Sequence, residues 1–414
     1  MTALSRATPH RRALLLVVAA VLVLATACAT AQPAPTPTPI PPPPAPMPTA
    51  VPATAAPQLP NPNSPPAKGR IVQGTITSAA LAHNLVGDPA TRTYYVYLPP
   101  GYSTSGKRYP VVYVIQGEQD MGFGPMDWVQ GGPASYAPLP TWMDSLLSTG
   151  AVKPMILVFP DSTNSFVYPE YFNSLTLGDY DTYISKELVA QIDSTYRTLT
   201  SPASRGLMGG VLEGGFGALH LSLRHPDVFG VSASMDPMMD PPNDSLPQAA
   251  ATSFQGNPEN FAVLQTKEAD GWPPATYYAQ AAAVASDPSK PPFYIDLPFK
   301  MLNGKGETDP AVFAKINDAF NLENDVHAYL GQPTRLSGLQ IYYDTDPENA
   351  EPFGFSIFSQ GVYRSTLVDN AYRSFDQFLT QNGVNHDTVA CEGEAESMNV
   401  SVPLKFMSAH LAFQ

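Results

Sequence analysis

The spacing of apolar residues divides much of the chain into strands and helices. Residues 93–98 alternate between the two faces of a strand, and the unbroken apolar run 111–115 is typical of a strand buried on both faces. Within residues 180–196, apolar positions recur with the period of an α-helix, which places their side chains on one face. The same reasoning predicts helices at 141–149 and 369–382 and strands at 231–235 and 339–343. With 414 residues, the chain is long enough for one large domain with a substantial core.

The N-terminal segment follows neither pattern. Residues 1–27 combine a basic start with an uncharged run rich in Leu, Val and Ala, which is the composition of an export signal and is short for a membrane span. Residues 24–28 are similar to the cleavage box of bacterial lipoproteins, so we expect Cys28 to carry lipid and to hold the protein on the cell envelope. The alternatives are an ordinary cleaved signal and an uncleaved anchor that extends to about Ala31.

Residues 28–68 form a proline-rich linker. Sixteen prolines lie between Pro33 and Pro66. Because proline fixes φ and has no amide donor, this stretch can form neither a helix interior nor a sheet, and we expect a semi-rigid polyproline spacer. At about 3.1 Å per residue, such a spacer could hold the following domain, residues 69–414, up to roughly 120 Å from its anchor.

Net charge and cysteine content bear on the partners and on the disulfides of the protein. The formal net charge is −14 at pH 7, which repels phosphate backbones and argues against nucleic acid as a partner. The only two cysteines are Cys28 and Cys391, so if Cys28 is modified no disulfide can form within the chain. Cysteine usage therefore says little about the redox compartment.

The stretch 204–219 reads as a short strand, a turn and a helix. Gly210 and Gly214 stand two positions either side of Leu212, as a sharp strand-to-helix turn requires, because a Cβ there would collide with neighbouring backbone. Such a turn raises the side chain of Leu212 to the edge of the sheet. Leucine has neither a proton to give up nor a lone pair to attack a carbonyl, so covalent acyl transfer by this side chain is excluded.

Two runs beside this turn carry a resemblance. Residues 214–219 and 224–229 match the pattern of the esterase D, feruloyl esterase and mycolyltransferase group of α/β-hydrolases, and residues 96–102 and 108–113 are similar to the opening strands of that group. The resemblance implies an α/β-hydrolase fold, with a mostly parallel central sheet and helices on both faces. It also implies that the insertion around 236–338 forms a cap over the pocket.

The same resemblance assigns the positions of the catalytic triad. Leu212 stands where the family has its nucleophilic serine, and Ala395 stands where it has histidine. The acid belongs to the loop after the strand 339–343, where Asp346 is the first candidate and Asp344 the second. These two carboxylates also faintly resemble a calcium loop, but the glycine of that loop is missing, so we expect no metal and no cofactor. The triad is therefore degenerate at two of its three positions.

The oxyanion hole of the family uses backbone donors, and these survive a change of side chain. The resemblance assigns them to Gln116, Gly117 and Glu213. The carboxylate of Glu118 would oppose a developing oxyanion if it pointed inward. Trp128 stands where the family often has an aromatic residue, so Glu118, Trp128 and Leu212 are the candidate pocket residues.

The loss of both nucleophile and base favours a non-catalytic protein of this fold, tethered to the envelope membrane through a lipidated Cys28. Its partner would be an unidentified small molecule or envelope component, bound in or around the former pocket. One alternative is an active esterase or acyltransferase with non-standard residues, such as Glu213 with Asp346 opposite. Another is a mainly structural envelope protein with a filled pocket.

Overall fold

The computed structural model describes residues 68–117, 124–131, 138–167, 169–238, 251, 274–328, 335–345, 363–390 and 400–414. The export signal, Cys28 and the linker up to residue 67 lie outside the described residues, and so do Glu118, Asp346 and Ala395. Within the described residues, no helix combines the length and the apolar character needed to cross a membrane.

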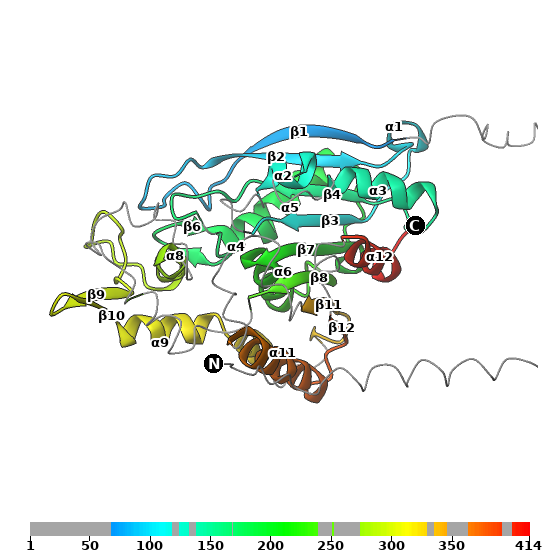
Figure 1. Cartoon of the computed structure of the whole chain (residues 1–414). Helices are drawn as coiled ribbons and strands as arrows, with labels where there is room; N and C mark the ends of the chain where they lie inside the picture. Colours follow the sequence, from blue (N-terminus) through cyan, green and yellow to red (C-terminus); the bar gives the residue numbers. More distant parts are fainter. Residues whose placement is uncertain are drawn as a thin grey trace, which may run out of the picture. The chain divides into compact units, whose positions relative to one another are not determined.

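An eight-stranded sheet in the order β1-β2-β4-β3-β7-β8-β11-β12 forms the centre of the domain (Figure 1). All neighbours from β4 to β12 are parallel, and β2 runs antiparallel to both β1 and β4. The strands are β1 (Arg70–Thr77), β2 (Thr91–Leu98), β3 (Val111–Ile115), β4 (Ile156–Pro160), β7 (Arg205–Leu212), β8 (Val231–Pro237), β11 (Gln340–Thr345) and β12 (His386–Ala390). The mostly parallel α/β sheet predicted from the sequence is confirmed.

Helices cover both faces of this sheet, because its inner strands bury side chains on both sides. Alternate residues of β3 enter different cores: Tyr113 packs in a cluster with Phe216, and Val112 packs in a cluster with Met143. The first cluster lies under α4 (Tyr180–Thr182), the π-helix η1 (Tyr183–Leu188), α5 (Val189–Thr195) and α6 (Glu213–Arg224). The second lies under α2 (Pro125–Gln130), α3 (Leu139–Ser148) and α12 (Ser401–His410). The prediction of helices on both faces is therefore confirmed.

Short elements complete the connections between these layers. They are α1 (Tyr102–Ser105), the 3-10 helix η2 (Pro202–Ser204) and the two-stranded pair β5 (Asn173–Ser174) and β6 (Gly178–Asp179). The 19-residue helix α11 (Tyr363–Gln381) precedes β12. The helix predicted at 180–196 is present as the uninterrupted run α4, η1 and α5, whose middle segment is a π-helix. The helix predicted at 369–382 begins six residues earlier.

The insertion after β8 extends the first core cluster, in which the rings of Phe293 and Phe166 lie 6.3 Å apart. Its described elements are α8 (Pro274–Val284), β9 (Phe299–Leu302), β10 (Lys305–Thr308), α9 (Pro310–Ala319) and α10 (Leu322–His327). Phe293 and Phe299 are buried and contact the ring of Tyr278, at centroid distances of 5.0 and 6.0 Å. These aromatic residues therefore belong to the core of the domain. A cap over a pocket stays a prediction, because residues 239–250 and 252–273 lie outside the described part.

Candidate functional site

A sharp strand-to-helix turn joins β7 to α6 with no residue between them, since β7 ends at Leu212 and α6 begins at Glu213. Glycine is required on both sides. A Cβ on Gly209 would overlap the carbonyl oxygen of Gly214, and a Cβ on Gly214 would lie 2.9 Å from the backbone nitrogen of Gly117. The sequence therefore folds here as predicted, with the helix start pressed against the end of β3.

Trp128 lies beneath this turn. Its side chain is buried, and a Cβ on Gly210 would overlap its indole ring. The structure therefore places this predicted pocket residue under β7, where the indole packs against the strand that carries Leu212. The side chain of Leu212 is not among those described, and its predicted burial stays a prediction.

The three triad positions follow strands whose carboxyl ends meet at one edge of the sheet. β7, β8, β11 and β12 are parallel neighbours in that order. Leu212 ends β7, while Asp346 and Ala395 come one residue after β11 and five residues after β12. Topology thus brings the carboxyl ends of β7, β11 and β12 to the same edge, and Asp346 and Ala395 lie outside the described residues.

Asp344, the second candidate for the triad acid, lies in a strand and not in the loop after it. It lies within β11, its side chain is buried, and its Oδ2 accepts a hydrogen bond from the hydroxyl of Tyr342 at 2.8 Å. Because Tyr342 stands two residues earlier in the strand, both side chains lie on the same face of the sheet. This placement gives Asp344 a defined partner inside the fold.

The segment after β3 is held from two sides. The buried amide of Gln116 accepts a hydrogen bond at Oε1 from the backbone nitrogen of Ser162 (2.8 Å), and the hydroxyl of Tyr171 donates to the carbonyl of Gln116 (2.6 Å). With Gly117 against Gly214, the structure brings together the backbone segments predicted to form an oxyanion hole. Their rigid support is the feature that such a hole requires.

A buried carboxyl pair lies at the start of α6, and sequence reasoning missed it. Glu213 is fully buried, and Glu170 is 1% exposed with no hydrogen-bond partner at either carboxylate oxygen in the described part of the chain. Burial, and then the charge of Glu213, raise the pKa of Glu170 well above its usual value. The signal in the sequence was a single acid within the aromatic run 166–172.

An imidazole–carboxylate pair joins α6 to α10, away from the turn. His220 Nδ1 lies 2.7 Å from Oδ2 of Asp325, and both side chains are buried. The ring of His220 packs against Phe172 and Phe216 at centroid distances of 4.3 and 5.3 Å. Eight residues separate His220 from Leu212, which is about 12 Å along a helix, so this imidazole cannot serve as the base at the turn.

The two histidines near the C-terminus lie elsewhere. His386 is the first residue of β12, so it lies at the amino end of that strand, away from the triad positions. Its Nε2 lies 3.1 Å from Oδ1 of Asp376. His410 ends α12 and packs on Phe406. His386 is half-buried and His410 is exposed.

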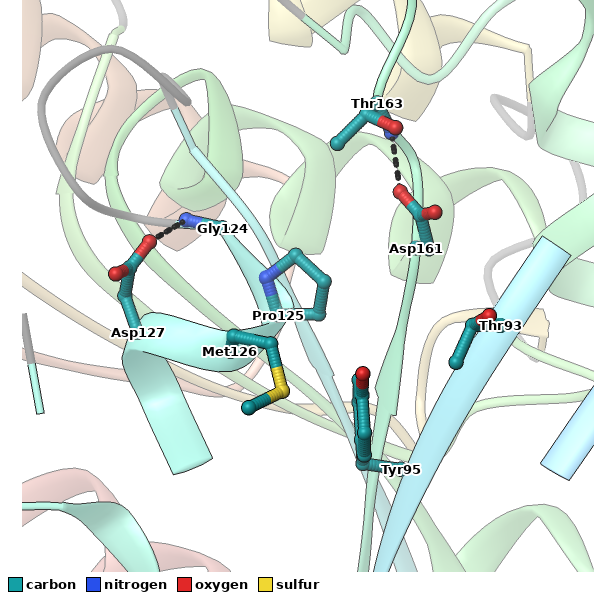
Figure 2. A pocket seen from close by; sticks show the side chains of 8 residues that line it. All are labelled: Thr93, Tyr95, Gly124, Pro125, Met126, Asp127, Asp161 and Thr163. Carbon is teal, nitrogen blue, oxygen red and sulfur yellow. Dashed lines mark hydrogen bonds between the residues drawn. The ribbon is translucent and has the colours of Figure 1, made fainter. Parts of the chain in front are cut away.

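A pocket of about 380 Å³ lies between α2 and the strands β2 and β4 (Figure 2). Its lining consists of Thr93, Tyr95, Gly124, Pro125, Met126, Asp127, Asp161 and Thr163, and we call it the α2 pocket. It contains none of the predicted site residues. Across the residues that the structure describes, no three His, Cys, Asp or Glu side chains are grouped so that they could hold a metal ion.

The model of the esterase family, described as "Putative esterase", matches residues 89–333, which is more than half of the chain. The chain belongs to this esterase family.

Two relatives of this esterase-family protein match a shorter segment. An endo-1,4-beta-xylanase/feruloyl esterase of Xylanibacter ruminicola is 32% identical over 144 residues, which are 34% of this chain and 18% of that protein. An esterase of Mycobacterium tuberculosis is 28% identical over 141 residues, which are 34% of this chain and 27% of that protein. The chain therefore matches only about a fifth to a quarter of the length of these relatives.

A solved structure supports the fold over a longer range. A ferulic acid esterase superposes with a TM-score of 0.53 at 18% sequence identity, covering 84% of this chain and all of that one. The likeness shows the α/β-hydrolase architecture. Within that architecture, this esterase-family protein has a hydrocarbon side chain at the end of β7.

Proposed function

We propose that this esterase-family protein does not hydrolyse esters at its strand-to-helix turn and instead acts as a binding protein. The observation that carries the proposal is the sequence at the turn, where β7 ends at Leu212 and α6 starts at the next residue. A hydroxyl or thiol is needed there for acyl transfer, and leucine offers neither. Ala395 removes the imidazole that would activate a neighbouring hydroxyl.

The backbone around the turn supports a binding site at the carboxyl ends of the strands. Gln116 is fixed by Ser162 and Tyr171, and Gly117 is pressed against the first turn of α6. These contacts keep the backbone at the carboxyl ends of β3 and β7 in place without a nucleophile. We therefore propose that the ligand, a small molecule or an envelope component, binds along the carboxyl edge of the sheet.

Catalysis by non-standard residues is the competing proposal, and one observation bears on it. Glu213 is fully buried beside Glu170, which resembles the carboxyl pairs that share a proton in acid–base catalysis. A catalytic carboxyl has to touch its substrate, and neither Glu213 nor Glu170 exposes more than 1% of its surface. The burial of both groups favours the binding function.

The place of action forms a separate part of the proposal. We propose that the protein is exported and anchored to the membrane by a lipid on Cys28, with residues 28–68 as the tether. Mass spectrometry of the mature N-terminus tests this directly. A mature chain that begins at a diacylglycerol-modified Cys28 supports the anchor. A mature chain in which Cys28 is unmodified or has been removed contradicts it.

An ester-hydrolysis assay tests the loss of activity. The purified full chain is incubated with p-nitrophenyl acetate and with methyl ferulate, beside Leu212→Ala and Glu213→Gln. We expect all three proteins to match the protein-free blank. Turnover by the wild type that persists in Leu212→Ala contradicts the proposal, and its disappearance in Glu213→Gln would identify the carboxyl pair as the reactive group.

A further inference from the structure

The hairpin formed by β9 and β10 is fixed at its base. Phe299, the first residue of β9, is 1% exposed and packs on the rings of Tyr277 and Phe313 at centroid distances of 5.6 and 5.9 Å. On β10, a Cβ on Gly306 would overlap the carbonyl oxygen of Ala251, so this strand also lies close against the domain. The core of the domain therefore holds the hairpin in place.

Beyond this base, residues 300–305 are exposed without interruption, and we call them the hairpin tip. Leu302 pairs with Lys305 across the two-residue turn Asn303–Gly304, whose φ angles of 52° and 76° are both positive, as a type I′ turn requires. The rise from Phe299 to Leu302 is three residues of strand, or about 10 Å. Figure 1 shows the hairpin (yellow) away from the central sheet, at the outer end of the insertion.

The hairpin tip exposes two adjacent apolar side chains. Met301 is 41% exposed and Leu302 is 47% exposed. Because neighbouring residues of a strand point to opposite faces, apolar surface is present on both faces of the tip. The other large apolar side chains that are exposed in the described part of the chain, Ile71, Leu175 and Val402, stand singly in the sequence. Single exposed apolar residues are ordinary, whereas an adjacent pair at a projecting turn indicates a contact surface.

The charge of the hairpin tip is opposite to that of the whole chain. The tip contains Lys300 and Lys305 and no acid, whereas the chain has a net charge of −14. Neither lysine forms an ion pair with another residue that the structure describes. Glu307, which stands opposite Lys300 on β10, is the single acid of the hairpin. The tip is therefore a small basic and apolar projection on an acidic protein.

These features fit the surface of an anionic bilayer. Apolar side chains flanked by lysines insert about 5–10 Å into the boundary between headgroups and acyl chains, a depth that the hairpin tip can reach. Each lysine near such a surface strengthens binding about fivefold. The acidic body of the protein is repelled, but at physiological ionic strength this repulsion decays over about 8 Å, which is less than the reach of the tip.

We propose that the hairpin tip is a membrane-contact element, which places Met301 and Leu302 in the headgroup region of an anionic bilayer and Lys300 and Lys305 on the lipid phosphates. This inference goes beyond the proposed function, because the tip contains no residue of the strand-to-helix turn. A lipid on Cys28 would keep the domain near the membrane through the linker 28–68, so that even a weak contact at the tip orients it. The contact itself does not depend on that anchor.

Tryptophan placed at the tip reports the contact. Leu302→Trp is compared with Val402→Trp, at an exposed position on α12, both in the full chain and both checked for folding by a thermal melt. Each protein is titrated with vesicles of phosphatidylglycerol and phosphatidylethanolamine in equal parts, with phosphatidylcholine vesicles, and with the brominated forms of these lipids. The wild-type fluorescence, which comes from Trp128, Trp142 and Trp272, is subtracted.

With the anionic vesicles, we expect the emission of Leu302→Trp to shift to shorter wavelength and to be quenched by brominated lipid, and that of Val402→Trp to stay unchanged. With phosphatidylcholine, the lipid concentration for half the change should be at least about tenfold higher. The export signal is common to all these proteins, so a response confined to Leu302→Trp belongs to the tip.

Three results would overturn the proposal. They are the absence of quenching in Leu302→Trp, equal quenching in Leu302→Trp and Val402→Trp, and equal responses to anionic and phosphatidylcholine vesicles. An emission shift of Leu302→Trp that grows with protein concentration in the absence of lipid, and is not increased by lipid, would likewise overturn it and assign the tip to contact with a second copy of the chain.

Replacing the lysines tests the charge of the tip. In the Leu302→Trp background, Lys300→Gln with Lys305→Gln should raise the concentration of anionic lipid for half the change by more than about tenfold. The matched control is Lys186→Gln with Lys405→Gln, at exposed positions on η1 and α12, which changes the net charge equally and leaves the tip intact. Equal losses in the two double variants would show a general attraction and would overturn the assignment to the tip.

Discussion

The buried carboxyl pair predicts an unusual dependence of stability on pH, which the substitution Glu170→Gln isolates. Glu170 is 1% exposed, lacks a hydrogen-bond partner at either oxygen in the described part of the chain, and lies beside the fully buried Glu213. Glutamine has nearly the shape of a protonated glutamic acid but carries no charge at any pH. The variant therefore keeps the packing and removes one titrating group.

The direction of the effect follows from the raised pKa of Glu170. The folded state holds its proton to higher pH than the unfolded chain, in which the carboxyl group titrates near 4.5. Stability from this group is therefore complete below pH 4.5, and it falls as the pH rises toward the raised pKa of the folded state. Within that window the loss approaches about 1.4 kcal/mol for each pH unit. In Glu170→Gln this loss is absent.

Urea unfolding followed by tryptophan fluorescence at pH 5, 6, 7 and 8 measures the effect, with the exposed substitution Asp387→Asn as control. We expect Glu170→Gln and the wild type to have similar free energies of unfolding near pH 5. As the pH rises, the free energy of unfolding of Glu170→Gln should increasingly exceed that of the wild type, while that of Asp387→Asn follows the wild type. Parallel curves for Glu170→Gln and the wild type from pH 5 to 8 would refute a buried, repelling carboxyl pair.

Two further predictions concern the two ends of α6, namely the turn at its start and the buried His220–Asp325 pair farther along it. Gly209→Ala places a Cβ on the carbonyl oxygen of Gly214, so we expect a loss of more than about 2 kcal/mol in thermal unfolding, whereas Gly338→Ala, with open space around it, should be neutral. Asp325→Ala leaves the buried imidazole of His220 without its carboxylate and should cost about 3 kcal/mol in urea unfolding. Unchanged unfolding midpoints in Gly209→Ala or Asp325→Ala would contradict these assignments.

Much of the fold could be predicted because local patterns agree with the global arrangement. The apolar run 111–115 does become the strand β3 with every side chain buried, and Gly210 and Gly214 do flank a sharp turn into α6. The helical spacing of apolar residues did not predict that the helix at 180–196 consists of three segments of different hydrogen-bonding pattern. The four-residue spacing of Ile184, Leu188 and Ile192 fits a regular α-helix, so it does not reveal the π-helix Tyr183–Leu188.

The environment of the site was less predictable, because it depends on which loops meet. Glu213 was interpreted through its backbone nitrogen, yet its side chain is buried and its charge raises the pKa of Glu170, which is 43 positions earlier in the chain. The α2 pocket likewise joins residues from β2, α2 and the segment after β4. No periodicity connects such distant segments, so only the folded chain shows that they form one site.

Restoring the missing groups tests the central claim most directly. Hydrolysis of p-nitrophenyl acetate is measured for the wild type, for Leu212→Ser and for the double variant Leu212→Ser with Ala395→His. We predict that the wild type and Leu212→Ser stay at the rate of the protein-free blank and that any gain is confined to the double variant. Robust turnover by the wild type or by Leu212→Ser alone would contradict the account, because it would show that a nucleophile or a base exists elsewhere.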